Sequence, residues 1–400
     1  MVDQSDSRKI HVLYIPKWYP NKYDPMPGLF IKRHAETLVG LCEVSLLYVH
    51  AEDQLDVNLS TIIKTDEDGI RTWRIYFRKS KCRIISIARL INLLKYFYFN
   101  FKGIRLISKT YRKPDLVHVN VLTRLGFVAW IYQVFTFTPY IITEHWTRYL
   151  PQVNSFKGKL RKQLTKMVVR YAKAVMPVTA NLKNAMLTHG LKNKNYRIVP
   201  NVVDTDLFTP RVKTKNPSPL KLIHLSCFTN EQKNISSILR VIKKLTAIRQ
   251  DFELYFVGDG KDFKKMKQIS DDCKLTDKFV FFTGLLEGEQ LVNAISSADL
   301  MIMFSHYENL PVVILESFAC GVPVISSKVG GIHEHLHADK GALVEARNED
   351  QFLKTLNHTL DQLNQFDKKT IREYALDHFS REIIGKQLYD IYSSATKRLS

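Results

Sequence analysis

Cysteine is scarce in this 400-residue sequence, and the few cysteines present form no recognisable pattern. The five lie at wide and irregular spacings, at Cys42, Cys82, Cys227, Cys273 and Cys320. No CxxC pair indicates a zinc site, and the odd number at these spacings indicates no disulfide framework. We therefore expect the chain to work in a reducing compartment.

Long apolar runs are also missing. No run reaches the ~18–20 residues that a membrane-spanning helix needs, and the polar opening MVDQSDSRKI does not resemble a signal peptide. No segment is of low complexity, and no repeat is detectable. With 45% hydrophobic and 11% aromatic residues the chain has ample material for packed cores, which excludes wholesale disorder, and its length predicts two domains.

Acidic residues are nearly absent from one stretch. Residues 71–200 contain 26 basic residues and only two acidic ones, Asp115 and Glu144, whereas residues 201–400 contain 26 of each sign. The excess behind the formal net charge of +20 therefore lies in the first half, and it predicts an anionic partner there. No zinc-finger, helix-turn-helix, RRM or KH signature accompanies the basic residues, so we expect no nucleic acid.

Strand and helix patterns alternate in both halves, which predicts an α/β protein with two parallel, doubly wound sheets. We expect a first Rossmann-like domain over residues 1–208, a polar linker over 209–218, a second Rossmann-like domain over 219–375, and a C-terminal helix in 376–400 that returns to the first domain. Expected strands are 9–15, 44–49, 116–120, 140–143, 174–178, 196–199, 221–225, 253–257, 279–282, 300–304 and 322–326. Expected helices are 28–39, 156–172, 234–248, 288–296, 311–320 and 380–398.

The most informative segment is 305–331, SHYENLPVVILESFACGVPVISSKVGG. It follows an expected strand, and Pro311 is well placed at the start of a helix that Gly321 ends. A helix N-terminus after a strand offers free N–H groups to phosphate. Glu308 precedes this helix and Glu316 lies within it, where an unpaired carboxylate among apolar residues would be costly. The two carboxylates could bind hydroxyls on either side of a diphosphate, although solvated surface acids remain an alternative.

This segment resembles the E-x7-E signature of the retaining, family 4 glycosyltransferases with the GT-B fold, also called glycosyl transferases group 1. Glu308 and Glu316 stand at the two Glu positions, and the surrounding ENLPVVILESFACGVPVI also matches. The resemblance covers most of residues 9–345 and is firmer after residue 196. It implies two Rossmann-like domains that face each other across a cleft, with a nucleotide-sugar on the second and an acceptor on the first.

The resemblance also implies roles for individual residues. The implied catalytic residues are Glu308, which contacts donor-sugar hydroxyls, Lys233, which neutralises the diphosphate, and His145, which faces the donor sugar. Implied donor-binding residues are Glu316, which holds the ribose, together with Asn309, Leu310, Gly258, Thr283, Gly284 and Ser305. Implied acceptor-side residues are Gly28, Gly330 and Gly331. No metal and no cofactor are expected beyond the nucleotide-sugar co-substrate, for which a UDP-sugar is favoured.

The sequence departs from the family pattern at several positions. An Arg that commonly precedes the Lys is missing from 227–229, and Lys328 and Arg347 are both open as substitutes. Val202 replaces a usual Gly, so we expect no left-handed turn there. Both Glu positions and Lys233 are retained, so the departures indicate a subgroup with its own donor pocket.

Other patterns in the sequence indicate different functions only weakly. The VGDG turn at 257–260 is a weak dinucleotide signal, and no GxSxG elbow supports a serine hydrolase. His333, His335 and His337 could bind metal on a strand, but surface histidines are the favoured interpretation. His118 is interpreted as a buried strand histidine.

The stretch 79–113 mixes basic residues with aromatic and aliphatic ones at helical spacings, which suits an anionic membrane surface. We therefore expect a cytoplasmic glycosyltransferase, peripheral to the inner face of the cell membrane through residues 71–200. It would transfer a sugar with retention to a glycan or lipid-linked acceptor in cell-surface polysaccharide synthesis. The alternatives are a GT-B-fold epimerase or phosphorylase, or a non-enzymatic protein that binds membrane or nucleic acid.

Overall fold

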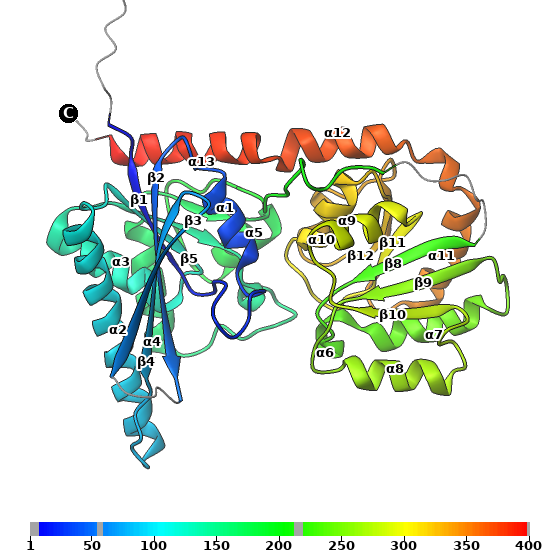
Figure 1. The fold of residues 1–400 in the computed structure, drawn as a ribbon, viewed down its shortest axis with the longest axis horizontal. Coiled ribbons are helices and arrows are strands. Elements are labelled where there is room, and N and C mark those ends of the chain that lie inside the picture. The colour runs from blue at the N-terminus through cyan, green and yellow to red at the C-terminus, as the bar shows by residue number, and fades with distance from the viewer. Residues whose placement is uncertain (1–7, 54–58, 212–218, 398–400) are drawn as a thin grey trace, which may run out of the picture.

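Two mainly parallel sheets, one in each half of the chain, organise the computed structural model (Figure 1). The structure describes residues 8–53, 59–211 and 219–397. The unit around the first sheet is called the N-domain below, and the unit around the second sheet the C-domain. The expected fold class, two Rossmann-like α/β domains, is confirmed.

The N-domain sheet has the strand order β3-β4-β2-β1-β5-β6-β7 within the described residues, and only β3 runs antiparallel to its neighbour. Its central strands are rich in Val, Ile and Leu and are buried on both faces, as parallel strands covered by helices must be. The strands are β1 (His11–Pro16), β2 (Glu43–Glu52), β3 (Ser60–Glu67), β4 (Ile70–Arg78), β5 (Leu116–Asn120), β6 (Tyr140–Glu144) and β7 (Val175–Pro177).

The C-domain sheet has the order β10-β9-β8-β11-β12-β13 and is parallel throughout its described strands. The strand order reverses direction between β8 and β11, and a doubly wound sheet binds ligands at such a point. The strands are β8 (Leu220–Leu225), β9 (Phe252–Val257), β10 (Val280–Gly284), β11 (Leu300–Met303), β12 (Val324–Ser327) and β13 (Gly341–Val344).

Helices cover both faces of each sheet (Figure 1). In the N-domain they are α1 (Leu29–Glu36), α2 (Ile85–Thr110), α3 (Thr123–Thr136), α4 (Lys159–Tyr171) and α5 (Ala180–Thr188), with the 3-10 turn η1 (Thr147–Tyr149). In the C-domain they are α6 (Asn230–Lys233), α7 (Ile235–Leu245), α8 (Phe263–Asp272), α9 (Gly288–Ser297), α10 (Val312–Ala319) and α11 (Glu349–Asp361), with η2 (Ile332–Glu334) and η3 (Leu363–Gln365). The chain ends with α12 (Lys368–Phe379) and α13 (Arg381–Thr396).

The last two helices connect the domains. In Figure 1, α12 lies along the C-domain and α13 continues along the N-domain. Tyr392 of α13 is fully buried, and its hydroxyl lies 2.7 Å from both the Tyr14 hydroxyl and His118 Nδ1. Arg372 of α12 donates to the backbone carbonyls of Thr205, Phe208 and Ala319 at 2.6–3.0 Å. The C-terminal helices therefore hold both sheets, while residues 212–218 of the expected linker lie outside the described residues.

Several details differ from what the sequence indicates, and one of them is the unexpected strand β13. The expected strand at 196–199 is wrong, because Tyr196 forms only an isolated bridge with Val175. Strands β3 and β4 were not expected, although the turn Asp68-Gly69 between them is a common hairpin pair and both residues have positive φ. His335 is half-buried against Phe379, so it is not the expected surface histidine, whereas His333 and His337 are exposed. His118 is the buried strand histidine that was expected.

No helix among the described residues combines the length and the apolar character that crossing a membrane requires. The longest helix, α2, has 26 residues and lies against the N-domain sheet through its second half. Gly103 allows this close approach, since an added Cβ would lie 2.5 Å from Leu47 Cδ1 and 3.0 Å from Ile75 Cδ1.

The contact at Gly103 gives a test of the packing. We expect Gly103→Val to destabilise the N-domain by about 1–3 kcal/mol, because the added isopropyl group overfills a packed site. The apparent melting temperature should fall by several degrees. The matched control is Ser86→Ala in the exposed first turn of α2. An unchanged melting temperature for Gly103→Val would contradict the packing of α2 described here.

Candidate functional site

The signature segment lies at the carboxyl end of β11, where the chain turns through residues 304–311 into α10. This loop is supported from behind by the turn that follows β12. An added Cβ at Gly330 would collide with the backbone oxygen of Glu308, and φ at Gly330 is +56°. The Gly331 amide donates to the Asn309 carbonyl at 2.9 Å. Gly330 and Gly331, expected on the acceptor side, therefore also fix the backbone that carries Glu308.

Glu308 is buried and paired with a lysine. Lys233 Nζ donates to Glu308 Oε1 at 2.6 Å, and Gln232 Nε2 donates to Oε2 at 3.2 Å. Burial alone would lower the pKa of Lys233, but the adjacent Glu308 carboxylate leaves it above its ordinary value. Lys233 is therefore a charged ammonium group, and it reaches the signature loop from the loop and short helix that follow β8.

Glu316 is paired with a cation from the other domain. Arg33 of α1 donates from Nη1 to Glu316 Oε1 at 2.7 Å, and the two side chains are 20% and 5% exposed. Glu316 Oε2 accepts no hydrogen bond from the described part of the chain. The expected ribose-binding carboxylate thus has one oxygen bound to the N-domain and one available to a ligand.

Other contacts across the domain boundary cluster around the same loop. Asn309 Nδ2 donates to the His145 carbonyl at 2.7 Å, and Asn201 Nδ2 donates to the Leu310 carbonyl at 2.8 Å. Glu334 accepts from the first two amides of α5 at 2.7 and 2.8 Å, a favourable place for a carboxylate. The signature loop is therefore an interdomain contact as well as a part of the C-domain.

His145 comes directly after β6 and borders the same loop. Its ring lies 4.6 Å from that of Phe30 and 5.6 Å from that of His34, measured between centroids. Burial lowers the pKa of His145 well below its ordinary value, although a side-chain interaction with Asn201 opposes this shift. Neither ring nitrogen has a partner with full hydrogen-bond geometry among the described residues. His145 is thus a neutral imidazole beside the Asn201 side chain.

The remaining expected donor residues occupy the ends of β9, β10 and β11. The Gly258 amide donates to the Gly284 carbonyl at 2.8 Å, and a Cβ at Gly258 would collide with the Ser226 carbonyl. Thr283 Oγ1 donates to the Gly284 carbonyl at 3.0 Å. Gly284 lines a hollow of about 430 Å³, together with Asp259, Gly260, Lys261, Phe263 and Lys264. Ser305 is buried and its hydroxyl has no partner among the described residues.

Gly28 lies at the N-cap of α1 with φ +77°, and an added Cβ would collide with the backbone of Trp18. Only glycine therefore allows the loop after β1 to approach α1 so closely. This places the Trp18 ring near Phe30 and Trp146, at 6.5 and 5.3 Å between centroids. The expected acceptor-side glycine thus shapes an aromatic wall beside His145.

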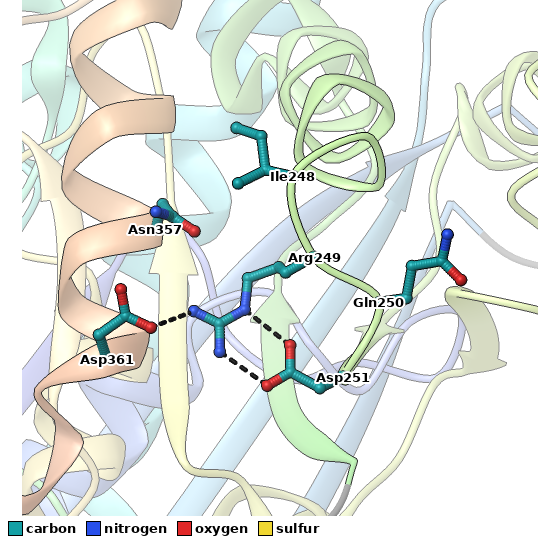
Figure 2. Close-up of a pocket in the computed structure, with 6 residues that line it drawn as sticks. All are labelled: Ile248, Arg249, Gln250, Asp251, Asn357 and Asp361. Atoms are coloured by element: carbon teal, nitrogen blue, oxygen red, sulfur yellow. Dashed lines mark hydrogen bonds and ion pairs between the residues drawn. The ribbon is translucent and has the colours of Figure 1, made fainter.

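A second hollow, of about 690 Å³, lies on another part of the C-domain (Figure 2). Its charged groups already bind one another, because Arg249 donates to both Asp251 and Asp361 at 2.7 Å. Asp251 directly precedes β9, so this hollow lies at the end of the sheet opposite the signature loop. We assign it no role.

The described residues contain no group of three His, Cys, Asp or Glu side chains arranged to hold a metal ion. His333, His335 and His337 surround the turn η2 and do not form such a group.

Comparisons with known proteins agree with this arrangement. Residues 208–375 match the family model described as glycosyl transferases group 1, and residues 31–207 match the model described as glycosyltransferase family 4. Sucrose-phosphate synthase from Thermosynechococcus elongatus superposes with a TM-score of 0.76 at 17% identity, over 96% of this chain and 99% of that one. The two family matches together span residues 31–375, and the chain has the GT-B fold.

Two further proteins show how wide this similarity is. The chain is 29% identical over 243 residues to N-acetyl-alpha-D-glucosaminyl L-malate synthase from Bacillus anthracis, which is 57% of this chain and 61% of that protein. The chain therefore spans less than two thirds of that relative. Anabaena HepE, solved with UDP-glucose, superposes with a TM-score of 0.69 at 16% identity, over 96% of this chain and all of that one.

The structure thus brings most of the expected site residues to one edge where the domains meet, and it adds Arg33, which the sequence analysis missed. No local signal marks Arg33, because its partner lies 283 positions away and α1 also carries Lys32.

The Arg33–Glu316 pair predicts non-additive stability. We expect Arg33→Met to destabilise the protein by about 1–3 kcal/mol, because it leaves a buried carboxylate without its charged partner. Adding Glu316→Gln should restore part of that loss. Apparent melting temperatures of the two single variants and the double variant measure the coupling. Additive losses would show that the two side chains do not interact in solution.

Proposed function

We propose that this GT-B glycosyltransferase transfers a sugar from a nucleotide-sugar to a glycan or lipid-linked acceptor with retention of anomeric configuration. The observation that carries the proposal is the pair of buried carboxylates Glu308 and Glu316. They flank the N-terminus of α10, and each is neutralised by a cation from another element. Such a site offers fixed charge and backbone N–H groups to a diphosphate without a metal ion.

The proposed roles follow the geometry. Glu316 Oε2 accepts a hydrogen bond from a ribose hydroxyl, while Glu316 Oε1 stays hydrogen-bonded to Arg33. Glu308 orients the donor-sugar hydroxyls, and Lys233 shares its ammonium between Glu308 and the diphosphate, where negative charge grows as the glycosidic bond breaks. The backbone at Asn309 and Leu310 lies against the sugar and phosphate. His145 uses a ring nitrogen toward the sugar.

The geometry also suggests a place for the nucleotide base and a residue that replaces the family's usual arginine. The base occupies the hollow beside Gly284, bounded by the turns at Gly258 and Thr283. Ser305 offers its unpaired hydroxyl at the end of β11. For the second phosphate contact we propose Arg347 rather than Lys328, because the positive charge of Arg347 helps to lower the pKa of His306 in the signature loop. The Arg347 side chain is exposed and has no ion pair among the described residues.

The donor and the setting are proposed from the relatives. Anabaena HepE was solved with UDP, with UDP and glucose, and with UDP-glucose, which supports a UDP-sugar donor here. A putative teichuronic acid biosynthesis glycosyltransferase from Bacillus subtilis is 22% identical over 81% of this chain. We propose a role in cell-surface polysaccharide synthesis, in the cytoplasm at the inner face of the membrane.

The first half of α2 supports a membrane-facing position. It exposes an apolar stripe made of Ile84, Ile87, Leu90, Leu94 and Tyr98, each 44–59% exposed. Arg83, just before the helix, and Arg89 and Lys102 within it are also exposed. In Figure 1 the first turns of α2 extend beyond the carboxyl ends of β2 and β4. An apolar stripe among cations suits an anionic lipid surface.

Glu316→Gln and Lys233→Ala test the transfer site. We expect each to reduce release of the nucleoside diphosphate about tenfold or more, because a charge-assisted hydrogen bond is worth roughly 1.5–3 kcal/mol. The assay first identifies a donor by thermal shift across UDP-, GDP- and ADP-sugars. Glu382→Gln and Lys243→Ala, both exposed, are the matched controls. Wild-type rates in both site variants would overturn the proposal, and phosphate-dependent or free-sugar products would favour the phosphorylase or epimerase alternative.

Charge reversal tests the membrane surface. We expect the triple change of Arg83, Arg89 and Lys102 to Glu to weaken binding to anionic phosphatidylglycerol vesicles about a hundredfold or more, at roughly 1 kcal/mol per basic residue. Lys95 is left unchanged because its ammonium donates to the Arg78 carbonyl. The control reverses Lys264, Lys265 and Lys267 on α8, an equal charge change on the C-domain. Equal losses in both triples would contradict a defined surface on α2.

A further inference from the structure

Two cations enclose the indole of Trp146 at the carboxyl edge of the N-domain sheet. Lys17, directly after β1, places Nζ 3.3 Å from the ring centroid, and Arg148 in η1 places Cζ 3.5 Å from it. Both distances are close to van der Waals contact with the ring, so two cations on one face would overlap. They therefore lie on opposite faces of Trp146.

Neither cation forms an ion pair within the part of the chain that the structure describes. Arg148 is only 8% exposed, and it makes no hydrogen bond or ion pair within the described residues; its Nε is buried without an acceptor. Lys17 Nζ lies over the rings of Trp18 and Trp146, and it makes no hydrogen bond to any described residue. Burial, together with the charge of Arg148, lowers the pKa of Lys17 to about 8. Desolvated cations without acceptors are costly, so this arrangement is incomplete as it stands.

The one carboxylate nearby is already committed to the backbone. Glu144 accepts from the amides of Leu122, His145 and Trp146 at 2.8–3.0 Å. Arg124 and Arg161 add positive charge, since both contribute to lowering the pKa of Lys17. Four cations therefore face a single carboxylate, which agrees with the near absence of acidic residues between 71 and 200.

The cluster borders the signature loop. The His145 carbonyl, one residue before Trp146, accepts from Asn309 Nδ2 at 2.7 Å. The Trp18 ring lies 5.3 Å from that of Trp146, between centroids. Trp18 belongs to the loop after β1, which can approach α1 closely because residue 28 is a glycine. An anion bound by Arg148 and attracted by Lys17 would therefore lie on the N-domain side of the donor sugar, where an acceptor must approach.

We propose that Arg148 binds an anionic group of the acceptor, either a phosphate or a carboxylate, and that Lys17, on the other face of Trp146, attracts the same anion through its charge without contacting it. This inference rests on the proposed transfer function and narrows its acceptor to an anionic one. The planar guanidinium of Arg148 has free N–H groups that can donate to two oxygens of the anion. The positive charge of the Lys17 ammonium adds to the attraction for that anion. The basic excess of the N-domain is, in part, a binding site.

Three probes separate the possible anions. With UDP kept saturating, glucose 1-phosphate, glucuronic acid and glucose are titrated by calorimetry and by tryptophan fluorescence, which Trp146 should report. We expect glucose 1-phosphate or glucuronic acid to bind at least tenfold more tightly than neutral glucose. The phosphate arm and the carboxylate arm identify which group the site prefers. Equal binding of all three probes would overturn the proposal.

Substitutions test whether Lys17 and Arg148 cause the preference for the anionic probes. Lys17→Met and Arg148→Gln should each reduce the preference for the anionic probe about tenfold, and Arg148→Lys should retain part of it, which also guards against misfolding of the glutamine variant. The exposed Lys159→Met makes the same charge change on α4 and should have no effect. An unchanged preference in Lys17→Met and Arg148→Lys, or an equal loss in Lys159→Met, would overturn the proposal.

UDP binding by the wild-type protein is the separate readout of the proposed function. Failure of UDP and of every nucleotide-sugar to bind would refute the transfer function and, with it, the acceptor interpretation. Normal UDP binding without any preference for the anionic probes would refute only the anion site.

Discussion

Burial of two carboxylates on one short segment is the constraint on which the rest of the site depends. Glu308 and Glu316 lie almost out of water, and a buried carboxylate without a partner is costly. Each therefore needs a cation from elsewhere, and the fold provides Lys233 from the loop after β8 and Arg33 from the N-domain. Because one of the two cations belongs to the other domain, the same requirement that stabilises the loop also brings the domains together.

The glycines around the signature loop serve that arrangement. Gly330 and Gly331 allow a second turn to lie directly behind Glu308, and Gly331 also meets Thr179 of the N-domain. Asn309 and Asn201 then connect the loop to the N-domain backbone. At the edge of the N-domain sheet the situation differs: Lys17 is half-buried and Arg148 is buried, and neither forms an ion pair within the described residues. The two carboxylates of the signature loop and α10 are thus neutralised by Lys233 and Arg33, whereas Lys17 and Arg148 would be neutralised by the proposed ligand.

Much of this could be predicted from local sequence. The apolar β-branched strands, the spacing of Glu308 and Glu316, and Pro311 at the start of α10 are short-range patterns, and they led to the right fold. Arg33 could not be predicted, because only the folded chain brings α1 to α10. The segment 196–199 resembles a strand by composition, yet tertiary context leaves it only one bridge. The hairpin of β3 and β4 was missed although Asp68-Gly69 is a local turn signal, since its polar outer strand lacks the apolar pattern of the others.

Hydrogen–deuterium exchange with and without the donor identified by thermal shift tests the central claim most directly, because it reports where the nucleotide-sugar binds. The account predicts that amides in 305–316 and 226–234 become protected when the donor is added, while those in 248–251, beside the hollow of Figure 2, do not change. Protection at 248–251 without protection at 305–316 would contradict it.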